Sequence, residues 1–151
     1  MPRLRVKTKV ALPPLIGWRE RVRLPDLGAG TLIAKIDTGA RSAALHAEDI
    51  EVNGHKVRFR VAINGRQHHC ELPVVGKRRV KSTSGHTETR VVVETDVKIG
   101  DHRFAIEVTL TNRTDMGVPM LLGRASVRGQ FLVHPGRSFI LSRKKRKSKP
   151  S

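Results

Sequence analysis

Asp37 is the residue of this sequence with the clearest capacity for chemistry, because of its neighbours on both sides. Residues 33–36 before it are mostly apolar, and Thr38 is followed by the small residues Gly39 and Ala40. The apolar approach predicts a buried strand that ends at Asp37, where an unpaired carboxylate is costly to ionise. We therefore expect Asp37 to be either well hydrogen-bonded or catalytic, although an Asp-Thr-Gly triplet alone is also common in surface turns.

A second candidate element lies far along the chain. Gly123 comes 84 residues after Gly39 and directly follows the apolar residues 120–122. The stretch GRASVRG, residues 123–129, then predicts a short helical turn. We expect this to be the one short helix of the protein.

The sequence offers no convincing set of metal ligands. It lacks H-E-x-x-H, and His68, His69 and Cys70 are contiguous, so on a strand His69 points away from the other two. We interpret Cys70 as a small core residue and the two histidines as strand residues. The other histidines have no ligand spacing, and His46 is the one worth testing. We expect no metal and no cofactor.

The elements that must position these residues are strands. Apolar residues alternate with polar ones in residues 16–24, 57–63, 91–99 and 104–110, a period of two that is typical of strands with one buried face. Asn53-Gly54, Asn64-Gly65 and Gly100-Asp101 are candidate hairpin turns. Residues 40–50 fit a strand or a helix, and we interpret them as a strand. The pattern predicts an all-β meander of antiparallel strands.

Composition predicts a single domain with basic ends. The chain has 151 residues, 38% of them hydrophobic, which is enough for a packed core. Six positive charges lie in residues 143–149 and four in residues 3–9, which leaves +7 of the net +17 for the body. We expect residues 1–13 to be a basic N-terminal extension, residues 14–141 to form the domain and residues 142–151 to be a disordered basic tail.

The same composition bounds the location and the partners of the protein. A lone cysteine excludes an intramolecular disulfide and indicates a reducing compartment. No signal-peptide core and no membrane-length apolar run are visible, so we expect a cytoplasmic protein without membrane contact. The charge favours an anionic partner, but four Phe, one Trp and no Tyr offer few surfaces on which RNA bases could stack.

Several stretches resemble the retropepsin-like aspartic peptidases. KIDTGARSAALHA, residues 35–47, is similar to their active-site strand and turn, and PMLLGRASV, residues 119–127, to the apolar-apolar-Gly-Arg element that braces it. A bacterial branch often labelled "ATP-dependent zinc protease", associated with ATP-grasp glutamate ligases that modify a ribosomal protein, is more similar still. That likeness extends through IGWRERVRLPDLG, RVKSTSGHTETRVVV, LTNRTDMGVPMLLGR and FLVHPGRS. The resemblance implies a closed antiparallel acid-protease barrel with one short helix.

The resemblance also implies a catalytic dyad. Aspartic peptidases use two carboxylates that share one proton; one takes a proton from the attacking water while the other protonates the substrate carbonyl. The chain has no second Asp-Thr-Gly or Asp-Ser-Gly, so a homodimer must pair Asp37 with its symmetry mate. Thr38 would lie beneath the dyad and form a hydrogen bond across the two-fold axis, with Gly39 and Ala40 lining the floor.

Further residues of the resembling stretches are candidates for substrate binding. KSTSGHTE, residues 81–88, could be the tip of a flap hairpin, with Ser84 and Gly85 over the substrate, or an ordinary exposed loop. Arginine forms paired hydrogen bonds with carboxylates, so arginines that converge on a cleft would select an acidic substrate, although each could also be an ordinary strand residue. The candidates are Ala40, Arg41, Ser84, Gly85, Arg90, Arg113, Leu122, Gly123 and Arg124.

Two functions remain open from the sequence. The first is a homodimeric aspartic endopeptidase that acts on acidic, glutamate-rich protein tails. The second is a non-catalytic basic β-barrel that binds RNA or ribosomes, with the basic C-terminal tail as a contact. A metallopeptidase, as the label of the similar branch suggests, has little support in the residues.

Overall fold

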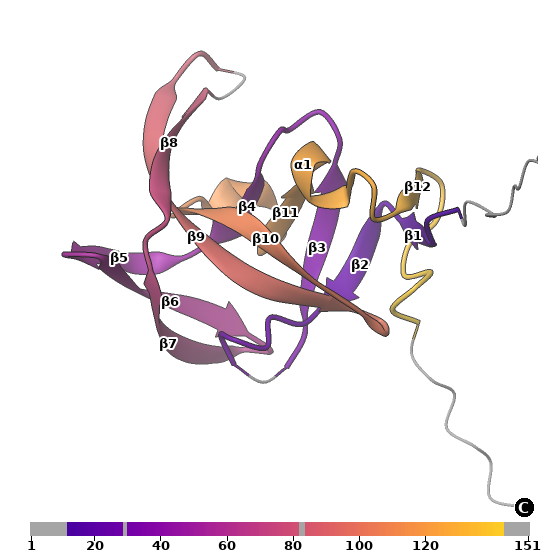
Figure 1. The fold of residues 1–151 in the computed structure, drawn as a ribbon, viewed down its shortest axis with the longest axis horizontal. Helices are drawn as coiled ribbons and strands as arrows, with labels where there is room; N and C mark the ends of the chain where they lie inside the picture. The colour runs from indigo at the N-terminus through magenta and orange to yellow at the C-terminus, as the bar shows by residue number, and fades with distance from the viewer. Residues whose placement is uncertain (1–11, 29, 82–83, 144–151) are drawn as a thin grey trace, which may run out of the picture.

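The protein is built mainly of β-strands, as a computed structural model shows (Figure 1). The structure describes residues 12–28, 30–81 and 84–143. In these residues the helical elements are α1 (Arg124–Val127) and the 3₁₀ turn η1 (Thr114–Met116). No helix there has the length and apolar character needed to cross a membrane. The predicted all-β class and the short helix after Gly123 are confirmed.

The strands form three sheets. The largest has the order β2-β3-β11-β4-β10-β9-β8, with bounds β2 (Arg19–Val22), β3 (Leu32–Asp37), β11 (Met120–Gly123), β4 (Ala43–His46), β10 (His102–Thr111), β9 (Thr87–Ile99) and β8 (Gly76–Lys81). The second consists of β5 (Glu48–Asn53), β6 (Lys56–Ile63) and β7 (Arg66–Pro73). The third pairs β1 (Leu15–Gly17) with β12 (Leu132–His134).

The large sheet is mixed, so the prediction of a purely antiparallel fold is wrong. β3 pairs in parallel with β11, and β4 pairs in parallel with β10. β1 and β12 are also parallel. Alternation of apolar residues shows which face of a strand is buried but not which strand lies beside it. These parallel partners lie far apart in the sequence, where no local turn signal can indicate them.

The large sheet curls towards closure without completing it. Arg23, just after β2, and Lys98 of β9 exchange two backbone hydrogen bonds of 2.9 Å each. This single bridge links an edge strand to the far side of the sheet, but the ladder does not continue. None of the three sheets in the described part of the chain is closed, so the closed barrel is not confirmed.

The predicted hairpin turns hold with one shift. Asn64 and Gly65 both have positive φ, 53° and 75°, as a tight turn between β6 and β7 requires. Gly100 and Asp101 connect β9 to β10. Asn53 instead pairs with Lys56, so the loop between β5 and β6 begins one residue later than expected.

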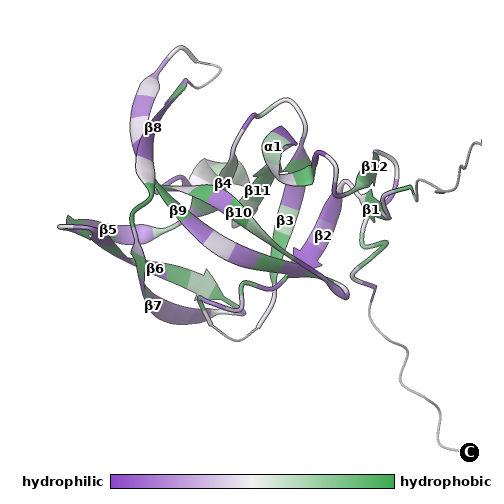
Figure 2. Cartoon of the chain, in the orientation of Figure 1, coloured by the Kyte–Doolittle hydropathy of each residue, from purple (hydrophilic) through white to green (hydrophobic). Residues whose placement is uncertain are grey.

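One continuous hydrophobic core joins the two larger sheets. Val57, Phe59, Val61 and Ile63 of β6 are buried together with inward residues of the large sheet such as Leu45. Figure 2 shows the hydrophilic and hydrophobic bands that alternate along the strands. The apolar residues that alternate along the strands in the sequence therefore face the core, and the polar residues between them face the surface.

A buried carboxylate attaches the end of the described chain to the domain. Glu20 of β2 is fully buried. It accepts backbone hydrogen bonds from Gly17 (2.6 Å), Ile140 (2.8 Å) and Ser142 (2.9 Å), and one from the Ser142 hydroxyl (2.6 Å). Burial alone would raise the pKa of Glu20, but these hydrogen bonds outweigh it and lower the pKa. Ser142, which we assigned to the tail, thus contacts the domain, whereas residues 1–11 and 144–151 lie outside the described residues.

Candidate active site

Asp37 ends β3, as predicted, beside Gly123 of the parallel strand β11. Its Oδ1 accepts hydrogen bonds from the backbone N–H groups of Gly39 (3.1 Å) and Ala40 (3.2 Å). Within the described residues, Oδ2 has no hydrogen-bond partner. The carboxylate is half-buried rather than enclosed. One oxygen is therefore fixed by the turn while the other is left for a ligand, a solvent molecule or a second carboxylate.

The turn after Asp37 is braced by the start of α1. The Arg124 guanidinium donates to the carbonyl of Thr38 (2.9 Å). The backbone N–H of Arg124 donates to the carbonyl of Ala40 (2.7 Å), and that of Ala125 to the carbonyl of Arg41 (3.0 Å). Arg124, which we expected to bind substrate, therefore holds the turn in place.

Leu122 and Gly123, also expected to bind substrate, lie beneath the turn. Leu122 is fully buried in the core. A Cβ on Gly123 would lie only 2.4 Å from the carbonyl oxygen of Ser42, so a side chain does not fit there. Both residues support the site by packing, and the alternation of the strand turns Leu121 towards the groove instead.

A groove of about 1100 Å³ lies beside Asp37. Its lining comes from residues 39–44, from β8, from residues 104–107 of β10 and from the region of α1. It brings together half of the predicted site residues, namely Asp37, Gly39, Ala40, Arg41, Arg90 and Arg113. The other half, Thr38, Ser84, Gly85, Leu122, Gly123 and Arg124, is not part of this lining.

The groove is strongly basic. In the described lining, the acidic residues are Asp37 and Glu107. The basic ones are Arg41, Arg78, Arg79, Lys81, Arg90, Arg113 and Arg128. Such a one-signed surface attracts anions. Sequence reasoning missed Arg78, Arg79, Lys81 and Arg128; the basic run just before the expected flap tip was the signal that could have revealed the first three.

Arg90 is the buried cation of this groove, with only 6% of its surface exposed. Its Nε donates to Glu88 Oε2 (3.2 Å), and its Nη1 lies 3.4 Å from the hydroxyl of Thr109. That hydroxyl donates onward to the carbonyl of Ala43 (3.0 Å). The guanidinium is therefore held in a fixed orientation, which suits recognition of a carboxylate.

Arg78 connects the hairpin strand β8 to the body. Its Nη1 donates to the Ser42 hydroxyl (2.9 Å), just after the Asp37 turn. Its Nη2 donates to Glu107 Oε1 (2.8 Å) on β10. One side chain thus ties together three walls of the groove.

The expected flap is a hairpin. β8 and β9 pair antiparallel from Gly76 opposite Val92 to Lys81 opposite Thr87. In Figure 1 the hairpin rises on the same side of the molecule as the turn after β3. Ser84 and Gly85 are exposed at its tip. Their contact with a substrate stays a prediction.

Thr38 and Gly39 are exposed at the tip of the Asp37 turn. The predicted place of Thr38, beneath a dyad and bonded to a second chain, requires that partner and stays a prediction.

The described residues contain no group of three or more histidines, cysteines or acidic residues that could hold a metal ion. Cys70 is buried, and its Sγ lies 3.5 Å from the carbonyl of Leu27. Burial raises the pKa of this thiol, which disfavours the reactive thiolate. Its interpretation as a core residue is confirmed.

Comparisons with known proteins identify the family of the chain. A family model described as "Retropepsin-like aspartic endopeptidase RimB" matches residues 15–144. Curated proteins named "Probable alpha-L-glutamate ligase" are similar: one from Shewanella halifaxensis is 35% identical over 144 residues, covering 84% of this chain and 30% of that protein. One from Parasynechococcus marenigrum is 38% identical over 129 residues, covering 80% and 28%. The chain spans less than a third of the length of these relatives.

One solved structure is similar to this chain over nearly the whole length of the solved protein. The crystal structure of a protein of unknown function from Legionella pneumophila has a TM-score of 0.72 and 35% identity, covering 85% of this chain and 98% of that one. The resemblance inferred from the sequence is thereby confirmed. The chain belongs to the RimB-like family of retropepsin-like aspartic endopeptidases.

Proposed function

We propose that the protein is an aspartic endopeptidase that works as a homodimer in the cytoplasm and cleaves acidic segments of proteins. The observation that carries this proposal is Asp37, whose Oδ1 is held by two backbone N–H groups next to a basic groove. The family description supports the class of reaction.

In the proposed dimer, Asp37 of each chain contributes one carboxylate to a shared dyad. Two carboxylates at close range cannot both ionise, so they hold one proton between them. The ionised one accepts a proton from water, which attacks the scissile carbonyl, while the protonated one donates its proton to the carbonyl oxygen. The exposed Thr38 and Gly39 support this arrangement, because the turn that carries Asp37 is accessible to a second copy.

The basic groove favours an acidic substrate. The buried Arg90 and the half-buried Arg113 line the same groove as Asp37. A charge-assisted hydrogen bond to a carboxylate contributes roughly 1.5 to 3 kcal/mol where water is excluded. Curated relatives that contain a similar stretch are named for a glutamate ligase, which fits a glutamate-rich tail as the substrate.

The decisive experiment compares a glutamate-tailed peptide with a glutamine-tailed peptide of equal length. Wild type should cleave the first much faster than the second, also in the presence of a strong chelator. Asp37→Asn should abolish cleavage while circular dichroism shows an unchanged fold. Cleavage by Asp37→Asn would rule out the aspartic mechanism. Equal rates on both peptides would rule out selection of the substrate by charge. Loss of activity in the chelator would favour a metallopeptidase.

A binding role towards RNA or ribosomes is the second candidate, favoured by the net charge of +17. The predicted basic tail, residues 142–151, would add to such a contact. Nucleic-acid affinity that falls steeply with salt and is equal in wild type and Asp37→Asn, together with no cleavage of any acidic peptide, would establish this candidate instead.

A further inference from the structure

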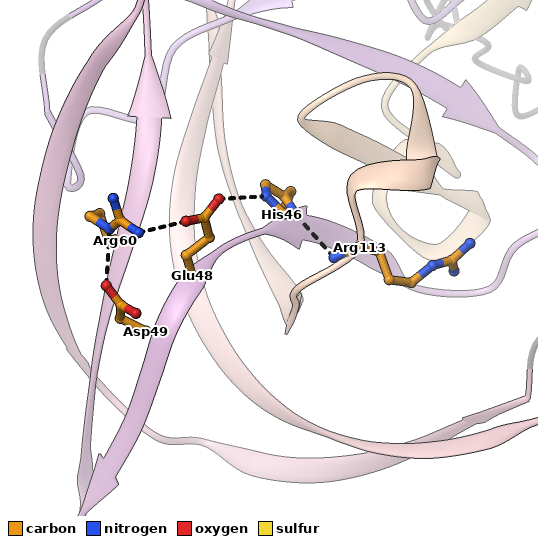
Figure 3. Close-up of polar contacts among 5 residues, drawn as sticks. All are labelled: His46, Glu48, Asp49, Arg60 and Arg113. Atoms are coloured by element: carbon orange, nitrogen blue, oxygen red, sulfur yellow. Dashed lines mark hydrogen bonds and ion pairs between the residues drawn. The ribbon is translucent and has the colours of Figure 1, made fainter.

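His46, at the end of β4, holds both ends of the loop that connects β10 to β11. Its backbone N–H donates to the carbonyl of Pro119 (2.8 Å), where the loop returns to β11. Its Nδ1 accepts the backbone N–H of Arg113 (3.0 Å), where the loop leaves β10 (Figure 3). The parallel pairing of His46 with Thr111 places the ring next to this exit. A single residue therefore fixes residues 112–119 at both ends.

The bond from Arg113 determines the state of the imidazole. Because an N–H group points at Nδ1, that nitrogen carries a lone pair and the ring proton lies on Nε2. Nε2 is 3.4 Å from Glu48 Oε1, which can accept this proton. The other oxygen of Glu48 accepts from Arg60 (2.5 Å), and Arg60 Nε donates to Asp49 (3.1 Å), as Figure 3 shows. The network orients a neutral ring.

This network ends at the groove, because Arg113 is one of the lining residues. We propose that His46 is a positioning residue: its neutral ring holds the main chain of Arg113 so that the guanidinium meets a carboxylate of the substrate, and protonation of the ring releases that hold. The inference rests on the proposed function, since it assumes that the groove binds an acidic peptide.

The pH dependence follows from the geometry of the two donors. A second ring proton would sit on Nδ1 and face the N–H of Arg113, so an attraction becomes a repulsion. Histidine ordinarily changes its charge between about pH 5 and 8. The charged groups of the network around the ring are Glu48 and Asp49 of β5, Arg60 of β6 and Arg113 itself.

Charge alone would give the opposite trend. A protonated His46 adds a positive charge near the groove and would tighten the binding of an acidic peptide. Loss of the hold on Arg113 weakens that binding instead. The direction of the change on acidification therefore separates positioning from simple electrostatic attraction.

The test measures binding of a glutamate-tailed peptide to the Asp37→Asn protein, which should not cleave it, at pH 8 and pH 6. His46→Asn is the matched control, because its side-chain oxygen can replace Nδ1 as the acceptor and does not titrate. His46→Leu removes the acceptor. We expect the protein that retains His46 to bind the peptide several-fold more weakly at pH 6 than at pH 8. At pH 8 the affinity of His46→Asn should lie within about twofold of that protein, and it should not fall at pH 6. His46→Leu should bind about tenfold more weakly than the protein with His46 at pH 8, and equally weakly at pH 6.

When His46→Leu is made in the protein that retains Asp37, it should raise KM for the peptide far more than it lowers kcat. Equal pH dependence in the His46 and His46→Asn proteins, or unchanged binding by His46→Leu, would overturn the inference. If no variant binds or cleaves the peptide, the proposed function fails. Hydrogen exchange of the Arg113 backbone amide then tests the positioning role independently of substrate. Protection that is lost in His46→Leu and kept in His46→Asn would support the role. Equal protection in all three proteins would overturn it.

Discussion

Asp37 shows how one side chain can be both fixed and reactive. Its Oδ1 is committed to the N–H groups of Gly39 and Ala40, so the orientation of the carboxylate does not depend on a substrate. An asparagine at this position can keep that acceptor, but it cannot share a proton with a second carboxylate. The Asp37→Asn variant therefore separates the structural role of the turn from its chemistry.

Arg90→Lys should impair turnover of an acidic peptide although the positive charge remains. The guanidinium reaches Glu88 and Thr109 together, and an ammonium group cannot reproduce this fork. We expect kcat/KM for the glutamate-tailed peptide to fall about tenfold or more. Arg79→Lys, a change at an exposed residue of the same groove, is the control and should alter kcat/KM by less than about threefold. A loss in Arg90→Lys as small as that in Arg79→Lys would mean that Arg90 acts only through its charge.

Glu20→Gln should destabilise the protein most at neutral pH. The pKa of Glu20 in the folded state lies below its ordinary value of 4.5, so its contribution to stability is fully present above pH 4.5 and is lost as the pH falls through the folded pKa. We expect a loss of about 3 kcal/mol at pH 7, because a carboxylate that accepts several buried hydrogen bonds is replaced by an amide. Urea unfolding at pH 7 and pH 3.5 measures this, and the difference between the proteins should shrink at pH 3.5. A constant difference would show that ionisation of Glu20 is irrelevant.

At the scale of elements, the active-site turn depends on a close contact between β11 and the chain after Asp37. Gly123→Ala would place a methyl group 2.4 Å from the Ser42 carbonyl oxygen, so backbone must move. We expect the variant to lose about 1 to 3 kcal/mol of stability and most of its peptidase activity. Gly76→Ala on β8 is the control, because a methyl group there meets nothing within 4 Å. Equal thermal midpoints for the two variants would contradict the proposed brace.

Local sequence patterns predicted where the strands and the helix lie, but they did not predict which strands pair with each other. The end of a strand at Asp37, the helix after Gly123 and the core role of Cys70 follow from sequence that is adjacent to each. The parallel pairing of β3 with β11 depends on residues far away along the chain. Glu20 was predictable in principle, since alternation places it on the buried face with Ile16 and Val22, but its partners at residues 140–142 were not.

At the scale of the whole molecule, a single Asp37 per chain makes the proposed activity a property of the dimer. Adding an equal amount of Asp37→Asn protein to a fixed amount of wild type should lower activity to about half after the chains exchange, because half of the wild-type chains then lie in mixed dimers. The measurement is the initial rate of peptide cleavage, with an unrelated protein added as the control. Undiminished activity would show that each chain works alone.

The position of β11 has a consequence for how the protein is made. This strand lies between β3 and β4 in the sheet, yet the ribosome synthesises it after both of them and after the entire hairpin of β8 and β9. During translation the central strands of the sheet therefore cannot pair until most of the domain has emerged from the ribosome. Contacts between residues so distant in the sequence give a high contact order and slow folding. Until β11 is in place, β3 and β4 expose backbone edges, and the nascent chain is most vulnerable to aggregation in that interval.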